Sequence, residues 1–406
     1  MFTHLENLER RAMLSASVVN GVLTINGTAG TDTYLITQVG DDLHVTENNV
    51  NLGSFAVDDD GSPHKALIEL YAGGGNDVVV LDASVTYNSE LYGQAGHDAI
   101  TGGSGQDDID GGPGNDTMHG GADDDTFYNN NTPAGIAGPV DKDEFYGDAG
   151  DEDSVRYDDR PVGVVVTLDD IANDGYATAV IGGASPEGDN VHSDVEGVGG
   201  TEFADYLVGN AKDNGLFGSG GNDTIYGSLG NDTLGAGEGN DTVYASDGND
   251  WILAGGGNDW ISAGSGNDTI NGSAGSDTMF GGLGTDTADY TNHVAAVVVR
   301  LDGLQNDGAV GEMDWIKSDV ENVVGTQFAD HITGSAAANF IDGKQGNDTI
   351  RGLDGNDTLI GGFGNDRIFG GIGDDSIQGN QDNDSLFGEA GTDVLDGGAG
   401  VNLVVQ

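Results

Sequence analysis

The residues best suited to chemistry are aspartates, which recur at every ninth position through much of the chain. Nine units of nine residues fill Gly209–Asp289, eight fill Gly334–Val405 and four fill Gly93–Tyr128. Isolated matches occur at 27–35 and 72–80. The consensus is G-G-x-G-N-D-T-U-x, in which U is apolar. Such units supply carboxylate and carbonyl oxygens, the ligands that hard cations such as calcium prefer.

The elements that must position these aspartates can be derived from a single unit. Thr224-Ile225-Tyr226 predicts a minimal strand whose middle side chain points inward. The six residues before it must reverse the chain, and glycine favours this because it readily adopts φ > 0. Two strands and two turns then close one coil in 18 residues, and coils stack about 4.8 Å apart. The sequence therefore predicts an all-β fold made of parallel β-roll (β-solenoid) blocks linked by short β-hairpin modules.

This stacking creates an electrostatic problem at the aspartates. Each lies about 5 Å from its counterpart 18 residues later, where like charges repel by roughly 3 kcal/mol at an effective dielectric near 20. Each strand buries one apolar side chain, worth about 2 kcal/mol, and ordering nine residues costs more than that. We therefore expect the roll to need a cation. Zinc and copper favour His or Cys, which the consensus lacks, and magnesium dehydrates too reluctantly for an all-protein cage, so calcium is expected.

The candidate calcium ligands are the sixth-position aspartates of the units, including two degenerate ones. They are Asp98, Asp107, Asp116, Asp125, Asp205, Asp223, Asp232, Asp241, Asp250, Asp259, Asp268, Asp277, Asp286, Asp330, Asp348, Asp357, Asp366, Asp375, Asp384 and Asp393. The alternative is that some of them only cap their own turns through backbone N–H groups. Asn214, Asn339 and Asn402 replace the aspartate in end units, as expected of atypical capping repeats.

Tandem units of this consensus resemble the calcium-binding nonapeptide repeats of the RTX (repeats-in-toxin, hemolysin-type) family. The strict repeats cover about half of the chain. The resemblance implies a β-roll that binds several Ca²⁺ ions, in a bacterial protein that is secreted or held at the cell surface. Such a protein would fold when it meets millimolar calcium outside the cell.

The remaining segments are shorter. Leu5–Ala16 predicts a short amphipathic helix and resembles an export segment of large bacterial surface proteins; an ordinary N-terminal helix is the alternative. Val18–Asp82 alternates apolar and polar residues, which favours a small antiparallel β region. An internal duplication with valine-rich pieces predicts hairpins that cap the rolls, and degenerate turns place Glu196 and Glu321 at the sixth position.

The expected organisation is an export-type segment at 1–16, an antiparallel β region at 17–92, a short β-roll at 93–128, a loop and β linking module at 129–190, a β-roll at 191–289, a linking module at 290–315 and a C-terminal β-roll at 316–406.

Composition limits the partners. The formal net charge of −58 opposes binding to nucleic acid and to anionic membrane surfaces. With no cysteine, disulfides and thiolate metal sites are excluded. The apolar run at Val294–Val299 is too short to span a membrane. Phosphate-loop, zinc-protease and nucleophile-elbow motifs are absent from the sequence, so we do not expect an enzyme.

Two classes of function remain open. The first is a secreted or cell-surface structural or adhesive protein, which would bind calcium and, through aromatic columns, cell-surface glycans or another copy. The second is a non-catalytic, repeat-bearing relative of a secreted toxin or polysaccharide-modifying enzyme. The columns are Tyr226, Tyr244 and Phe280 with Trp260 beside them, and Phe369 with Phe387. Cross-strand stacking that stiffens the sheet is the alternative reading of these columns.

Overall fold

The computed structural model describes residues 15–56, 67–129, 141–176 and 188–406. Every regular element among these residues is a strand, and none of them forms a helix that could cross a membrane. The expected N-terminal helix falls almost wholly within residues 1–14, outside the described residues. The chain forms two compact units, unit 1 (Met1–Asn210) and unit 2 (Ala211–Gln406).

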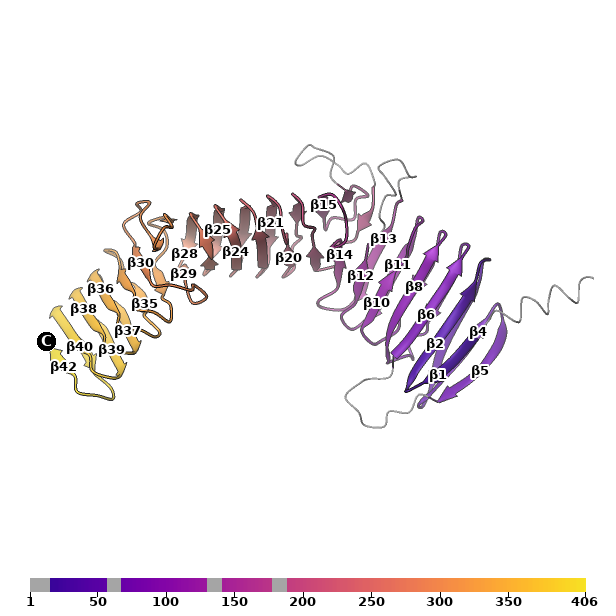
Figure 1. Ribbon diagram of the computed structural model, residues 1–406, viewed down its shortest axis with the longest axis horizontal. Coiled ribbons are helices and arrows are strands. Elements are labelled where there is room, and N and C mark those ends of the chain that lie inside the picture. The colour runs from indigo at the N-terminus through magenta and orange to yellow at the C-terminus, as the bar shows by residue number, and fades with distance from the viewer. Residues whose placement is uncertain (1–14, 57–66, 130–140, 177–187) are drawn as a thin grey trace, which may run out of the picture. The chain divides into compact units, whose positions relative to one another are not determined.

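Unit 2 is a parallel β-solenoid whose strands alternate between opposite sheets (Figure 1). One sheet contains β20 (Gly215–Phe217), β22 (Thr233–Glu238), β24 (Trp251–Gly257), β26 (Thr269–Asn271), β27 (Ala274–Gly275), β29 (Thr287–Asp289), β33 (Asn322–Val324), β35 (Phe340–Asp342), β37 (Thr358–Phe363), β39 (Ser376–Gln381) and β41 (Val394–Asp396). The opposite side contains β21 (Thr224–Leu229), β23 (Thr242–Asp247), β25 (Trp260–Gly266), β28 (Thr278–Gly284) and β32 (Trp315–Ile316), then β30 (Val297–Arg300), β31 (Gly308–Ala309), β34 (His331–Thr333), β36 (Thr349–Asp354), β38 (Arg367–Ile372), β40 (Ser385–Ala390) and β42 (Leu403–Val405).

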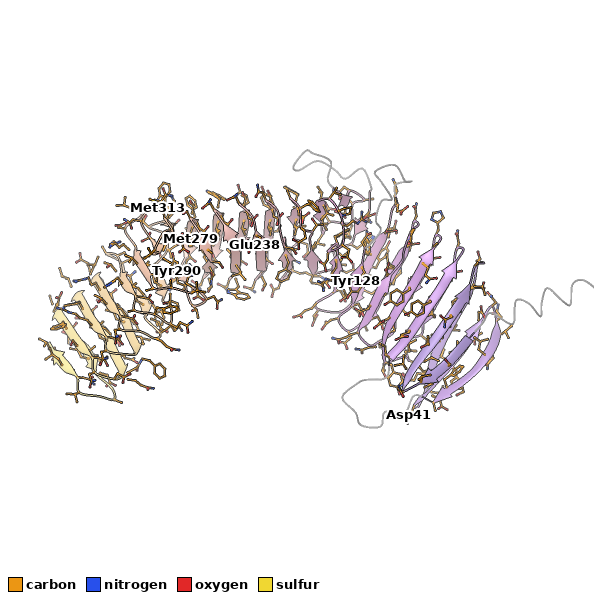
Figure 2. All side chains as sticks on the ribbon, viewed as in Figure 1. Asp41, Tyr128, Glu238, Met279, Tyr290 and Met313 are labelled. Carbon is orange, nitrogen blue, oxygen red and sulfur yellow. The ribbon has the colours of Figure 1, made fainter. Side chains whose placement is uncertain are left out.

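The register of these strands confirms the coil of 18 residues. Ile225 pairs with Val243, and Val243 pairs with Ile261, each in parallel. Internal eighth-position side chains form the core and are at most 1% exposed, as Met279 in β28 illustrates (Figure 2). The strands are longer than the predicted three residues, since they run on into the next unit and bury its first position, for example Ala236.

Two left-handed residues make each regular turn of unit 2. In the unit that begins at Gly227, the second residue, Ser228, has φ 87° and the fourth, Gly230, has φ 115°. Serine occupies the second position in several units, whereas glycine predominates at the fourth for a further reason. A Cβ on Gly239 would lie 1.4 Å from the carbonyl oxygen of Gly221 in the preceding coil, so the close approach of stacked turns excludes a side chain there. Where Asp123 and Asp382 take the fourth position, φ is 75° and 77°, well below the 156° of Gly239.

Unit 1 has the same architecture with longer loops. One sheet contains β1 (Ser15–Val19), β2 (Val22–Thr28), β6 (Leu67–Gly74), β8 (Asn88–Ala95), β10 (Asp107–Asp110), β12 (Thr126–Tyr128), β14 (Ser154–Arg156) and β18 (Gly197–Gly199). The other contains β5 (Val50–Ala56), β4 (Asp42–Glu47), β3 (Thr33–Val39), β7 (Val78–Leu81), β9 (Ala99–Thr101), β11 (Thr117–Ala122), β13 (Glu144–Ala149) and β17 (Asn190–Val191), and β15 (Val164–Thr167), β16 (Gly175–Tyr176) and β19 (Tyr206–Val208) form a third group.

The antiparallel region expected at 17–92 needs correction. Among the described residues of this range, only β1 with β2, β3 with β4, and β4 with β5 pair antiparallel. β2, β6 and β8 pair in parallel, as do β3, β7 and β9. The solenoid therefore includes β2 and β3, and the antiparallel strands β4 and β5 lie within one long coil. Alternation of apolar and polar residues does not distinguish parallel from antiparallel pairing, because strands of both kinds bury every second side chain.

The linking modules also differ from the expectation. β15 pairs antiparallel with β16, and β30 with β31, so both hairpins are present. However, β13 and β14 belong to the parallel stack of unit 1. In unit 2, β32 pairs in parallel with β28, and β33 pairs in parallel with β29. The parallel stack is therefore not interrupted by the expected module at 290–315. Each module is therefore an insertion within a coil.

Candidate calcium sites

The sixth-position aspartates are buried and joined in ladders. All twenty candidate aspartates are at most 6% exposed. The backbone N–H of most of them donates to a carboxylate oxygen one coil further on, as Asp223 does to Asp241 Oδ1 at 2.8 Å and Asp241 to Asp259 at 2.8 Å. Such bonds between aspartates 18 residues apart span 2.7 to 3.1 Å. Each turn thus fixes the carboxylate of the next.

The second oxygen of most of these carboxylates is buried without a hydrogen bond. Among the described residues this holds for Oδ2 of Asp98, Asp116, Asp125, Asp232, Asp241, Asp250, Asp259, Asp268, Asp277, Asp286, Asp348, Asp357, Asp366, Asp375, Asp384 and Asp393. A buried carboxylate oxygen without a partner is costly, so columns of them indicate a ligand that the polypeptide does not supply.

Three candidate aspartates differ, because both of their oxygens accept hydrogen bonds. Asp107 accepts the hydroxyl of Ser89 and the N–H of Gly103. Asp205 Oδ2 accepts the N–H of Thr201 at 2.6 Å, and Asp330 Oδ2 accepts that of Thr326 at 2.7 Å. These carboxylates cap their own turns, which is the alternative that the sequence left open.

The ladders also contain acids outside the twenty candidates, and two of them, Glu196 and Glu321, hold the sixth position of the predicted degenerate turns. In unit 1 one column runs through Asp32, Asp77, Asp98, Asp116, Asp143 and Asp189, and another ends at Asp153 and Glu196. In unit 2 the columns through Asp277 and Asp286 end at Asp314 and Glu321. The isolated matches at 27–35 and 72–80 place Asp32 and Asp77 at the sixth position, so a signal for these two was present.

The pKa values of the aspartates in these columns are raised. Burial, together with neighbouring carboxylates, raises the pKa of Asp116 to about 8, and that of Asp348 also to about 8. The same causes raise the pKa of Asp232 to about 7 and that of Asp259 to about 6. At neutral pH the ionised forms of Asp116 and Asp348 are therefore disfavoured unless a cation accompanies them, whereas ionisation of Asp232 and Asp259 is only harder than that of a free aspartate.

An asparagine in the last unit shows what surrounds the second oxygen. Asn402 Oδ1 accepts the N–H of Asp384, as an aspartate would. Asn402 Nδ2 lies beside Gly397 and donates to the carbonyl of that residue at 2.6 Å. In the preceding unit, Asp393 Oδ2 takes the equivalent place beside Gly388. The position that aspartate Oδ2 takes elsewhere therefore borders carbonyl oxygens, and a cation could bind both.

The donor set fits calcium. Among the described residues, no three His, Cys, Asp or Glu side chains converge tightly enough to hold a metal by themselves. A site must therefore combine carboxylates with turn carbonyls, which gives an all-oxygen shell of the kind that calcium accepts and that zinc or copper does not favour.

The aromatic columns lie where the 18-residue register predicts. Tyr226 and Tyr244 stack with ring centroids 4.7 Å apart, and Trp260 lies 4.9 Å from Tyr244 and 5.3 Å from Phe280. A second stack joins Phe369 and Phe387 at 4.9 Å. The rings of Tyr226 and Tyr244, and those of Phe369 and Phe387, are nearly parallel, which is the arrangement of cross-strand stacking, whereas Trp260 is tilted by 55° to Tyr244 and by 49° to Phe280.

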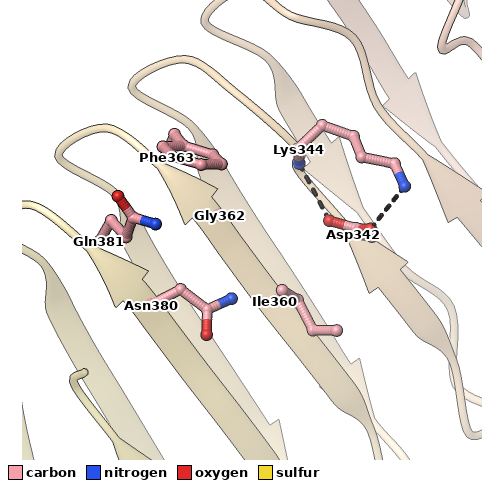
Figure 3. A pocket seen from close by; sticks show the side chains of 7 residues that line it. All are labelled: Asp342, Lys344, Ile360, Gly362, Phe363, Asn380 and Gln381. Atoms are coloured by element: carbon pink, nitrogen blue, oxygen red, sulfur yellow. Dashed lines mark hydrogen bonds and ion pairs between the residues drawn. The ribbon is translucent and has the colours of Figure 1, made fainter. Parts of the chain in front are cut away.

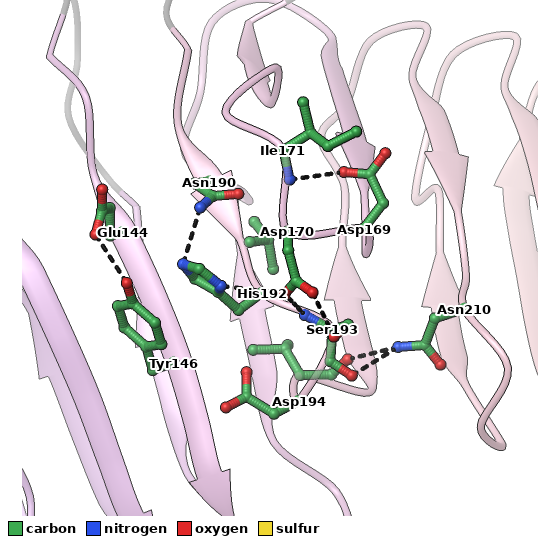
Figure 4. A network of polar contacts seen from close by, with 12 residues as sticks. Glu144, Tyr146, Asp169, Asp170, Ile171, Asn190, His192, Ser193, Asp194 and Asn210 are labelled. Carbon is green, nitrogen blue, oxygen red and sulfur yellow. Dashed lines mark hydrogen bonds and ion pairs between the residues drawn. The ribbon is translucent and has the colours of Figure 1, made fainter.

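Polar contacts hold the hairpin insertion of unit 1 (Figure 4). Asp170 accepts the N–H of Ser193 at 2.9 Å and its hydroxyl at 3.0 Å, and it lies 3.1 Å from His192 Nδ1. The Ser193 N–H is the main cause that lowers the pKa of Asp170. Asn210 donates to the Ser193 carbonyl, and Tyr146 stacks on His192. These groups satisfy one another, so we assign them a structural role.

Comparison with known families agrees with this geometry. The RTX calcium-binding nonapeptide repeat matches at residues 86–109, 92–127, 199–234, 235–270, 253–288, 318–350, 343–377 and 369–404. A comparison with curated proteins gave no significant match. The matched segments cover more than half of the 406 residues and coincide with the regular coils. The chain therefore belongs to the family of RTX calcium-binding nonapeptide repeat proteins, whose repeats bind Ca²⁺.

Proposed function

We propose that this chain is a secreted or cell-surface structural protein whose solenoid folds when its aspartate columns bind extracellular calcium. The observation that carries the proposal is the set of buried carboxylate oxygens without hydrogen-bond partners, which repeats from coil to coil. The family supports calcium binding, and the repeat solenoid is a structural calcium-binding fold. The extracellular site and the structural role are our inference.

We assign the ligands on the state of Oδ2. Aspartates whose Oδ2 has no hydrogen bond would bind calcium together with turn carbonyls, for example Asp232, Asp250 and Asp268 in one column. Asp107, Asp205 and Asp330 would serve as turn caps. A bound calcium ion supplies positive charge that relieves repulsion along the column.

Folding and calcium binding would be one event. A coil buries two eighth-position side chains, worth about 2 kcal/mol each, while its backbone ordering costs roughly 1 kcal/mol or more per residue. Repulsion between ionised aspartates adds to the deficit. The chain would remain unfolded where calcium is scarce and fold where it is millimolar.

Far-UV circular dichroism of the calcium-free full chain, titrated with calcium and in parallel with magnesium, tests this function. We expect a cooperative gain of β signal with calcium between micromolar and millimolar concentration, and no such gain with magnesium. A calcium-free protein already rich in β structure at pH 7.5, and indifferent to calcium, would refute the proposal.

A further inference from the structure

The surface of unit 2 carries a hollow of about 390 Å³ that the calcium columns do not use (Figure 3). Three successive strands of one sheet, β35, β37 and β39, and the turn after β35 contribute to it. Its lining residues are Asp342, Lys344, Ile360, Gly362, Phe363, Asn380 and Gln381.

A glycine at one repeat position creates the hollow. Lys344, Gly362 and Asn380 hold the second position of three successive coils, and Gly362 pairs in register with Asn380. The middle coil thus lacks a side chain between two that have long ones. Gly362 has φ 109°, and a Cβ there would lie 2.0 Å from the carbonyl oxygen of Lys344. The turn geometry therefore keeps this floor open.

The walls combine an exposed ring with polar groups that have no partners. Phe363 is 53% exposed, and among the described residues no other ring stacks on it, unlike the rings of the aromatic columns. Gln381 pairs with Phe363 in register. In the described part of the chain, the side-chain amides of Asn380 and Gln381 make no hydrogen bond. Donors and acceptors thus flank an accessible apolar surface.

The charged pair in the hollow is internally balanced. Lys344 Nζ lies 2.9 Å from Asp342 Oδ2, and the Lys344 N–H donates to Asp342 Oδ1 at 3.0 Å. The pair therefore offers a donor and an acceptor without net charge. Because the chain as a whole carries −58, a polyanion would be repelled on approach.

We propose that this hollow binds a neutral sugar unit of a polysaccharide. The C–H face of a sugar can pack on Phe363 above the floor of Ile360 and Gly362, and its hydroxyls can pair with Asn380, Gln381 and the Asp342–Lys344 pair. The inference deepens the surface role proposed above, and it rests on that function in requiring the calcium-folded roll.

The test uses the full chain in 5 mM calcium and calorimetric titration with cellohexaose, mannohexaose and chitohexaose, with polygalacturonate as an anionic probe. We expect at least one neutral hexasaccharide to bind. Phe363→Ala and Gln381→Ala should each weaken that binding about tenfold, which corresponds to roughly 1.4 kcal/mol. The matched control is Phe217→Ala in β20, which removes a ring that is 48% exposed and lies outside the hollow; it should leave affinity unchanged.

Three results would overturn the proposal: no binding of any neutral probe, unchanged affinity in both hollow variants, or preference for polygalacturonate. A calcium titration by circular dichroism accompanies each variant. A wild-type chain that fails to fold with calcium would refute the proposed function, whereas a calcium-folded chain that binds none of the neutral sugars would refute the sugar site alone.

Discussion

At the scale of single residues, the sixth position decides whether a turn can hold calcium. Asn402 occupies an ordinary glycine turn, and its Nδ2 donates to carbonyls of that turn. We predict that Asn402→Asp adds one calcium ligand. At a calcium concentration that only just folds the wild type, the variant should lose about 1 to 3 kcal/mol, because a half-buried carboxylate replaces a satisfied amide. With millimolar calcium its melting temperature should equal or exceed that of the wild type, as differential scanning calorimetry would show.

Asn339 provides the matched control. Its Oδ1 accepts the N–H of Ser335, and Ala337 takes the place of the fourth-position glycine, so the turn differs from a calcium-binding one. Asn339→Asp should lose stability at limiting and at millimolar calcium alike. Equal rescue of the two variants by calcium would contradict the role assigned to the carbonyls of the glycine turn.

The sequence located the sixth-position aspartates but not the state of their second oxygen. Burial of Asp232 or Asp348 follows from the repeat, since each aspartate precedes an inward-facing strand. Whether Oδ2 is satisfied depends on local donors such as Thr201 and Thr326, which replace the residue at the second position. The repeat pattern does not predict this difference, because it depends on the hydrogen bonds within each individual turn.

At the scale of the element, the turn is more sensitive than the strand to an added methyl group. We predict that Gly239→Ala costs at least about 2 kcal/mol, because φ is 156° there and the Cβ would overlap the Gly221 carbonyl. Gly256→Ala is the control: its Cβ meets the end of the flexible Glu238 side chain, and φ is not left-handed. It should change stability by about 0.5 kcal/mol or less. Urea unfolding in calcium measures both, and equal losses would contradict stacking of turns at the fourth position.

Element type and coil length could be predicted only where the repeat is uninterrupted. Ile225, Val243 and Ile261 lie 18 residues apart in sequence and in register. In unit 1 the aspartates of successive coils are separated by 45, 21, 18, 27 and 46 residues, because loops and the strands β4 and β5 enter the coils. Such insertions remove the period without removing the solenoid, so residues 17–92 were assigned the wrong strand pairing.

At the scale of the whole molecule, the aspartate columns make folding depend on pH. Burial raises the pKa of Asp125 and Asp277 to about 8, and that of Asp268 and Asp357 to about 6, from an ordinary value of 3.8. Because the folded state holds these protons more tightly, the stability that they contribute is complete below about pH 4. It is lost as pH rises through 6 and then 8.

We therefore predict that the calcium-free chain is more stable at pH 5 than at pH 8.5, and that the stability gained from millimolar calcium is larger at pH 8.5. Calcium affinity should fall as pH is lowered from 8 to 5, since protons compete for the same carboxylates. Thermal unfolding followed by circular dichroism at both pH values, with calcium and after its removal, measures each effect. Calcium-free stability that instead rises with pH would show that the aspartate columns do not dominate the energetics, because ionisation would then favour the folded state.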